Sequence, residues 1–181
     1  MNTNRKKITS GTRRCHRALV LLATAATLAT GLSGTAQADE AQIERGRYLA
    51  QIAGCGDCHT PGHFLGNADM TRFLGGSDVG FEVPGFGTVY GPNLTPDDET
   101  GLGTWTPDQM VAAIRTGMTP EGRVLLPVMP WPNLAALNDE DAYAIAAFLQ
   151  SLDPVSHAVP GPVPEGEPAP SFVMRVIPPG G

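Results

Sequence analysis

The sequence predicts a small all-α domain in which about three to four helices are joined by glycine-rich loops. Three observations support this fold class. Residues 41–53, 106–116 and 138–152 each repeat apolar residues at helical spacing. Residues 60–103 are rich in glycine and turn-forming residues. The pentapeptide Cys55-Gly56-Asp57-Cys58-His59, at the end of the first helix, can hold a group on which these loops pack.

Residues 1–38 have the pattern of a secretory signal peptide. A basic stretch precedes an apolar run over residues 18–30, and Ala36-Gln37-Ala38 matches a small-residue cleavage site. The apolar run is short for a bilayer span. We therefore expect cleavage after Ala38, loss of Cys15, a periplasmic or secreted product, and no membrane span in the mature chain. An uncleaved anchor is the alternative.

The mature chain is strongly acidic. Residues 39–181 keep six arginines, no lysine and all eighteen acidic residues, which gives a formal charge of −12. This charge repels nucleic acid and anionic membrane surfaces, so we expect no nucleic-acid partner. It favours either a basic partner surface or simple solubility.

Residues 41–53 are predicted to form the first helix of the mature chain. Tyr48, Leu49 and Ile52 share one stripe, which we expect to be buried. Gly46 has no Cβ and can admit a closely packed neighbour.

The motif at residues 55–59 is typical of c-type haem attachment. Two thiols separated by two residues can each bond to a vinyl group on one porphyrin edge, and the adjacent imidazole can bind the iron. The sequence thus predicts one covalently attached haem c (heme c) on Cys55, Cys58 and His59. One alternative is a redox dithiol. Such a pair normally lies in a βαβ frame, whereas here a helix-like stretch precedes the motif and irregular chain follows it. The other is a zinc site with His63, in which adjacent Cys58 and His59 strain a tetrahedral shell.

The loop region that follows the motif has little regular structure and needs an apolar group to pack against. Residues 60–103 are predicted to be irregular apart from one short hairpin that pairs residues 81–83 with 88–90. An irregular stretch of this length is unusual in a compact domain. A buried porphyrin offers a large apolar plate to a chain that is too short for a large core of its own.

Two later helices carry clear start signals. Thr106 and Gln109 form a capping-box pattern, Pro107 occupies the first helical position, and Gly117 ends that helix. Asn138 caps the other helix, and acidic residues follow in its first turn. The residues expected to be buried are Met110, Val111 and Ile114 in the former and Ile145, Phe148, Leu149 and Leu152 in the latter.

Met129 is the predicted second axial ligand. It lies in an apolar strap, residues 125–132, whose prolines disfavour helix and favour an extended path. The strap follows His59 by seventy residues and can cross the other face of a flat ring. A thioether ligand raises the reduction potential, and a filled sixth position disfavours oxygen or peroxide chemistry. The alternatives are ordinary packing of Met129 or ligation by Met118; less favoured are His63, His157, Met70, Met110 and Met174.

Residues 154–181 are predicted to be a proline-rich extended tail. Their apolar side chains cluster at residues 172–177. The tail is either a disordered end or a segment that docks on a partner or on the domain itself.

Several stretches resemble class I c-type cytochromes. The resemblance is closer to the cytochrome subunits or domains that accept electrons from bacterial alcohol, aldehyde and nicotinate-type dehydrogenases. It covers nearly all of residues 41–153 and is carried by residues 45–49, 55–60, 86–97, 101–106, 129–131 and 139–152. It implies a small cytochrome c fold for residues 39–153, with terminal helices crossing near Gly46. The haem-binding set that it implies is Cys55, Cys58, His59 and Met129.

The function expected from these features is single-electron transfer by a periplasmic monohaem c-type cytochrome. A dehydrogenase is the expected donor, and a downstream cytochrome or oxidase is the expected acceptor. Electron transfer through a haem iron needs no side chain to act as an acid, a base or a nucleophile. We therefore do not expect the chain to be an enzyme. Two alternatives require that Met129 does not bind iron: a haem enzyme subunit with an open sixth site for peroxide or sulfur chemistry, and a haem-based sensor of small ligands.

Overall fold

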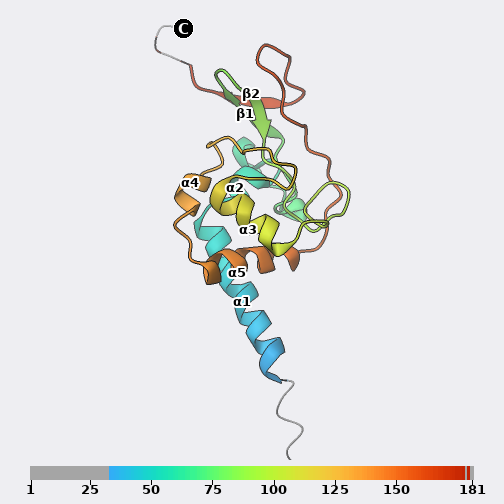
Figure 1. The fold of residues 1–181 in the computed structure, drawn as a ribbon. Coiled ribbons are helices and arrows are strands. Elements are labelled where there is room, and N and C mark those ends of the chain that lie inside the picture. The colour runs from blue at the N-terminus through green and yellow to red at the C-terminus, as the bar shows by residue number, and fades with distance from the viewer. Residues whose placement is uncertain (1–32, 178, 180–181) are drawn as a thin grey trace, which may run out of the picture. The chain divides into compact units, whose positions relative to one another are not determined.

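The structure is a computed structural model that describes residues 33–177 and 179 (Figure 1). Residues 1–32, which hold most of the predicted signal peptide with Cys15, lie outside the described residues. The compact unit Ala38–Gly181 contains the fold discussed below. None of the described helices combines the length and the apolar character needed to cross a membrane.

The described part of the chain contains five α-helices, two short 3₁₀ turns and three strands. In chain order they are α1 (Ser33–Ile52), α2 (Cys55–His59), η1 (His63–Leu65), η2 (Met70–Arg72), β1 (Val79–Val83), β2 (Gly87–Tyr90), α3 (Pro107–Thr116), α4 (Trp131–Leu134), α5 (Asp139–Gln150) and β3 (Phe172–Arg175). The three helices located in the sequence are present as α1, α3 and α5, but the described residues form five α-helices and not about three to four, because the short α2 and α4 add to them. The predicted all-α class is incomplete as a description, because the described residues also form a three-stranded sheet.

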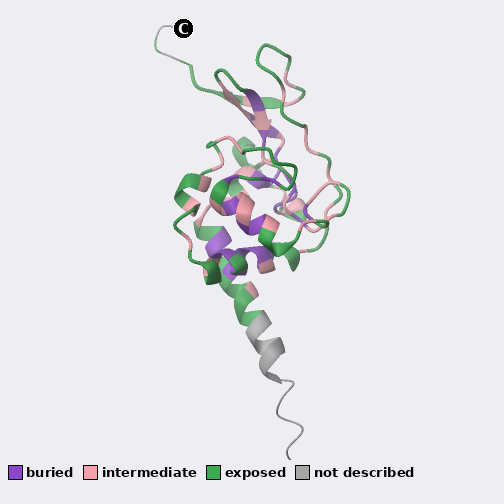
Figure 2. Cartoon of the chain, viewed as in Figure 1, coloured by how far each residue is buried: buried purple, intermediate pink, exposed green. Residues whose placement is uncertain are grey.

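Helices α1, α3 and α5 enclose the apolar core, which is coloured purple in Figure 2. Phe148 on α5 is almost fully buried, and burial of such a ring stabilises the fold by about 1.5–3 kcal/mol. Helix α1 crosses α5 at Gly46, where a Cβ would overlap the carbonyl oxygen of Ala144. The close approach expected at Gly46 is therefore present.

The buried face of α1 differs from the prediction. Leu49 is buried as expected, but Tyr48 is 54% exposed and Ile52 is 63% exposed. The crossing at Gly46 turns the positions three and four residues later, Leu49 and Ala50, toward the core. Tyr48 and Ile52 lie beside this contact face, so size and hydrophobicity alone indicated the wrong stripe.

The predicted starts of the two later helices are confirmed, whereas α1 begins at Ser33 and not at residue 41 as predicted. The Thr106 hydroxyl accepts from the Gln109 N–H at 3.3 Å, and the Gln109 side chain accepts from the Thr106 N–H at 2.9 Å. Gly117 ends α3 with a φ of +70°. The Asn138 side chain accepts from the Asp141 N–H at 2.8 Å and caps α5. Leu152, expected in the last turn, lies two residues beyond the end of α5 and is half-buried.

The sheet joins the predicted hairpin to the tail. Strands β1 and β2 form the predicted antiparallel hairpin, in which Phe81 lies opposite Val89. Strand β3 is parallel to β1, with Met174 opposite Phe81, so the strand order is β2-β1-β3. Figure 1 shows the orange-to-red C-terminal segment following the side of the domain to this sheet. Of the alternatives for the tail, docking on the domain itself describes the backbone of residues 155–175. The apolar cluster expected to dock is mostly exposed, because Phe172, Met174, Val176 and Ile177 remain open to solvent.

Candidate haem-binding site

Helix α2 presents the cysteine motif immediately after α1. Gly54 adopts a left-handed conformation, with a φ of +69°, and turns the chain between the two helices. Cys55 and Cys58 are three residues apart on α2, and positions with this spacing share one face of a helix. His59 follows as the last helical residue and is buried. The local fold therefore delivers both thiols and the imidazole to the same region.

A mostly apolar cavity of about 390 Å³ opens beside α2, within the size range of small-molecule and cofactor pockets. Side chains from the helices, the loop after β2, the strap and the tail line it. Among them are Cys55, Cys58, His59, Leu94, Leu102, Met110, Ile114, Leu125, Leu126, Met129, Ile145, Leu149 and Val159. All four residues predicted to hold the haem therefore border one cavity.

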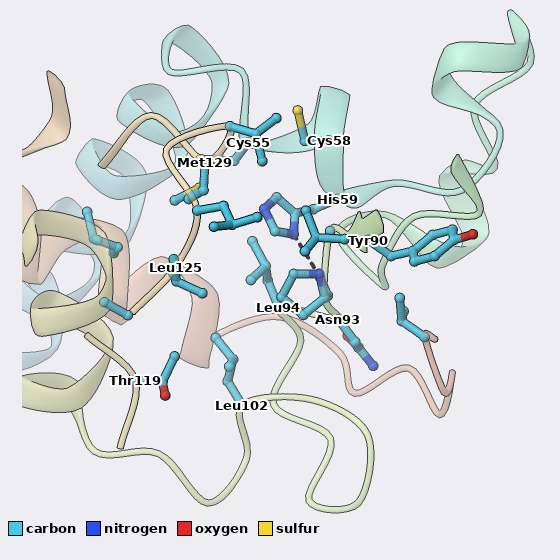
Figure 3. A pocket seen from close by; sticks show the side chains of 18 of the residues that line it. Cys55, Cys58, His59, Tyr90, Asn93, Leu94, Leu102, Thr119, Leu125 and Met129 are labelled. Atoms are coloured by element: carbon cyan, nitrogen blue, oxygen red, sulfur yellow. Dashed lines mark hydrogen bonds between the residues drawn. The ribbon is translucent and has the colours of Figure 1, made fainter. Parts of the chain in front are cut away.

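A backbone carbonyl orients His59. Its Nδ1 lies 2.7 Å from the Pro92 carbonyl oxygen, dashed in Figure 3. Since a carbonyl only accepts, Nδ1 carries the proton and Nε2 is the nitrogen available to a metal. Burial lowers the pKa of His59, although the bond to Pro92 opposes this shift. The ring is therefore kept neutral, which is the form that binds iron.

The two thiols do not have the electrostatics of a redox dithiol. Burial raises the pKa of Cys55 to about 11, and burial also raises the pKa of Cys58. Reactive Cys-x-x-Cys pairs have the opposite property, a lowered thiol pKa that supplies the thiolate. The surroundings of the two thiols therefore argue against a redox-dithiol role.

The zinc alternative lacks its fourth ligand. His63 is exposed, with its Nε2 lying 3.6 Å from a carboxylate oxygen of Asp57. Within residues 40–177, no three or more His, Cys, Asp or Glu side chains converge as a metal site requires. The histidine that a zinc site would need is thus directed elsewhere.

The strap that carries Met129 is less extended than predicted. It turns before Met129, whose N–H donates to the Leu126 carbonyl at 3.0 Å, and α4 starts at Trp131. Proline is unfavourable in the interior of a helix but is tolerated at its start. Pro130 occupies the N-cap position of α4, and Pro132 lies in its first turn. The Trp131 indole donates to the Leu125 carbonyl at 3.0 Å and fixes the turn.

Met129 enters the cavity from a different segment than His59. Figure 3 shows His59 extending from α2 and Met129 from the strap. Met110 also lines the cavity, but it is only 1% exposed and belongs to the core cluster. Met118 is 42% exposed and is absent from the lining. The structure therefore leaves Met129 and Met110 as the methionines that border the site.

The remaining ligand alternatives lie outside the cavity lining. Met70 and Met174 are exposed. His157, on the tail, donates from Nδ1 to the Gly75 carbonyl at 2.6 Å. Together with the exposed His63, these side chains are not brought to the site.

These residues fit a c-type haem. The cavity is apolar, its wall carries two neighbouring thiols, and one neutral imidazole has its Nε2 free of the Pro92 contact. Met129 adds a thioether from another wall. Gly91 lets the loop after β2 pack directly on the motif, since a Cβ there would overlap the Cys58 carbonyl oxygen.

Sequence reasoning missed three contributors to the site. The Pro92 carbonyl is a backbone group, so it leaves no side-chain signal. Asn93 is fully buried and bonds to the N–H of Thr95, and an Asn followed two residues later by Thr was the available clue. Residues 159–162 of the tail line the cavity. Their proline-rich composition predicted only an extended path.

A family profile and several curated relatives match this chain. The profile described as Cytochrome c matches residues 43–153. The cytochrome c subunit of a quinone-dependent alcohol dehydrogenase of Gluconobacter oxydans is 36% identical over 127 residues, 70% of this chain and 25% of the relative. One of the subunits of nicotinate dehydrogenase from Pseudomonas putida is 38% identical over 120 residues, 66% of this chain and 9% of the relative.

A third relative is the gluconate 2-dehydrogenase cytochrome c subunit of Pantoea cypripedii. It is 36% identical over 123 residues, which are 67% of this chain and 26% of the relative. The chain thus spans between 9% and 26% of the length of these three proteins.

Proposed function

Because the chain belongs to the cytochrome c family, we propose that it is a periplasmic monohaem electron carrier that takes single electrons from a dehydrogenase. Family membership implies covalently bound haem c and electron transfer. The proposal adds one haem per chain, the ligand pair, the compartment and the direction of transfer. A downstream cytochrome or an oxidase is the proposed acceptor.

The observation that carries this proposal is the convergence of Cys55, Cys58, His59 and Met129 on one apolar cavity. The sequence contains a single Cys-x-x-Cys-His motif, which supports one haem. The two cysteines would hold the haem by thioether bonds, and His59 and Met129 would be its axial ligands. When bound, the haem supplies an iron centre that exchanges one electron at a time.

The residues around the site favour a carrier over an enzyme. The Pro92 carbonyl keeps His59 in one orientation, so the ligand does not need to reorganise as the charge at the site changes. The apolar lining limits entry of water. If Met129 binds the iron as proposed, it would leave no coordination position for a substrate.

The partner and the compartment are inferred from sequence features. The relatives named above are subunits of dehydrogenases, which supports a dehydrogenase as the donor. The signal-peptide pattern of residues 1–38 supports export. The formal charge of −12 after cleavage supports docking to a basic surface.

The test is to produce the full chain in a bacterium that attaches c-type haem and to determine its mass and electron capacity. We expect a mature chain starting at Asp39, one haem that remains after denaturation, and uptake of one electron per chain in a coulometric titration. Cys58→Ser is expected to lower the yield of stably attached haem, and Cys15→Ser is the matched control. Two electrons per chain, or steady consumption of peroxide, contradict the proposal.

A further inference from the structure

The C-terminal segment contacts the loop that holds the His59 side chain. Asn93 is 1% exposed and follows Pro92, whose carbonyl accepts from His59. Its amide nitrogen donates to the Val155 carbonyl at 2.7 Å and to the Thr100 hydroxyl at 3.1 Å. Its amide oxygen accepts from the N–H and the hydroxyl of Thr95 at 2.9 and 2.8 Å. The amide is fully hydrogen-bonded, so it links the His59 acceptor rigidly to the tail.

The tail backbone completes the same network. The Val155 N–H donates to the Thr95 hydroxyl at 3.0 Å, and the His157 N–H donates to the Thr100 hydroxyl at 3.0 Å. Alternate residues of an extended segment face the same side, which explains why residues 155 and 157 bond to this loop. The loop after β2 is therefore fixed to the tail at two successive points.

The same segment also contacts the loop that holds the His59 backbone. The His157 side chain donates to the Gly75 carbonyl at 2.6 Å. The next residue, Gly76, donates its N–H to the His59 carbonyl at 2.8 Å. A Cβ at Gly76 would overlap a methyl group of Val159, so the tail packs directly on this loop. The tail is thus connected to the His59 ring through Pro92 and Asn93, and to the His59 backbone through Gly75 and Gly76.

We propose that residues 155–159 form a clamp that positions His59, with Asn93 and His157 as its positioning residues. The proposal rests on the proposed function only in taking His59 as the iron ligand. The clamp lies outside residues 43–153, which match the family profile.

The clamp acts through the hydrogen bond between His59 and Pro92. This bond weakens steeply when its distance or angle changes. A firm bond from Nδ1 makes the imidazole a stronger donor, which favours ferric over ferrous iron. Loosening the clamp is therefore expected to raise the reduction potential without removing any ligand.

The test compares midpoint potentials of the haem-loaded full chain and its variants by spectroelectrochemical titration. We expect Asn93→Ala and His157→Ala to shift the ferric/ferrous equilibrium about tenfold toward ferrous iron, which is about 59 mV for a one-electron couple. His157→Asn should restore most of the wild-type value, because the Asn amide can donate from a position near that of Nδ1.

Ser171→Ala is the matched control. It removes another tail hydrogen bond to a backbone carbonyl, 2.6 Å to Asp78, at the β3 end of the tail. We expect a wild-type potential from it. His157 is only partly buried, so its variants keep the test available if Asn93→Ala fails to mature.

The clamp is overturned if the His157→Ala potential equals that of the wild type while only its thermal stability falls, since the tail is then a structural support alone. An equal shift in Ser171→Ala also overturns it, because the effect is then not specific to residues 155–159. The carrier proposal is contradicted by a different observation, which is carbon monoxide binding by the wild-type protein. Such binding would not affect the comparison of midpoint potentials, because a five-coordinate iron would also be bound by His59.

Discussion

The Nδ1 atom of His59 lies 2.7 Å from the carbonyl oxygen of Pro92, 33 residues later in the chain. This contact joins the cysteine motif on α2 to the loop after β2. The join depends on Gly91, where a Cβ would overlap the carbonyl oxygen of Cys58. The orientation of the proposed iron ligand is thus set by the fit between two backbone segments.

Gly91→Ala should disturb this fit. The added methyl group has to displace the loop from α2, and overpacking of this kind costs about 1–3 kcal/mol. We expect a lower thermal midpoint and a lower yield of haem-loaded protein, measured as the ratio of haem absorbance to protein mass. The control is Gly161→Ala, which also borders the cavity but has no atom within 4 Å of the added Cβ. Equal yields from the two variants contradict the account of Gly91.

Gly46→Ala should destabilise the crossing of α1 and α5. In a free helix this change stabilises by about 0.8–1.0 kcal/mol. Here the Cβ overlaps the Ala144 carbonyl, and the strain of about 1–3 kcal/mol outweighs that gain. Guanidinium unfolding of the haem-loaded protein should give a lower midpoint for Gly46→Ala. Gln51→Ala, an exposed position of the same helix, should leave it nearly unchanged.

Thr106→Ala should weaken the start of α3. Thr106 and Gln109 satisfy each other's backbone N–H groups, and loss of such a cap costs about 1 kcal/mol. We expect this loss in the free energy of unfolding, with an unchanged haem spectrum. Thr104→Ala, an exposed threonine just before the helix, is the control. A loss of the same size in both variants argues against the cap.

Asp69 should contribute stability that is lost in acid. Hydrogen bonds from Thr71, and then from Arg72, lower the pKa of Asp69 from 3.8 to about 2. A group whose folded-state pKa is depressed stabilises fully above its unfolded value and loses this contribution as pH falls through the folded value. The gap in urea midpoint between wild type and Asp69→Asn should therefore close between pH 3.8 and pH 2. A gap of constant size over this window contradicts the assignment, and Asp153→Asn controls for general charge effects.

The helices were predictable where the signals are local. The caps at Thr106 and Asn138 depend on residues within one turn, and the structure has both. The hairpin around Gly87 was predictable for the same reason. The pairing of Phe81 with Met174 joins residues 93 positions apart, and no local pattern encodes it. The exposed Tyr48 shows the same limit, because the crossing partner of α1 decides which stripe is buried.

The site was predictable to the extent that it is made of side chains with specific chemistry. Cys55, Cys58 and His59 follow from one motif, and Met129 was chosen because its strap could return over the ring. The structure brings all four to one cavity. The Pro92 carbonyl and the tail at Val159 were not predicted, because a backbone group and an aliphatic side chain in a proline-rich segment carry no distinctive signal. The roles of these four residues in holding the haem, and the cleavage site after Ala38, stay predictions.

The most direct test of the central claim is carbon monoxide binding to the ferrous protein, compared between wild type and Met129→Ala. We expect the wild type to exclude the gas and its ferric form to show the weak red sulfur-to-iron band. Met129→Ala should bind the gas and lose the band, whereas Met110→Leu and Met118→Ala should behave as wild type. If the wild type binds carbon monoxide, or if Met110→Leu is the variant that loses the band, Met129 is not the sixth ligand. Binding by the wild type also contradicts the closed site on which the carrier function depends.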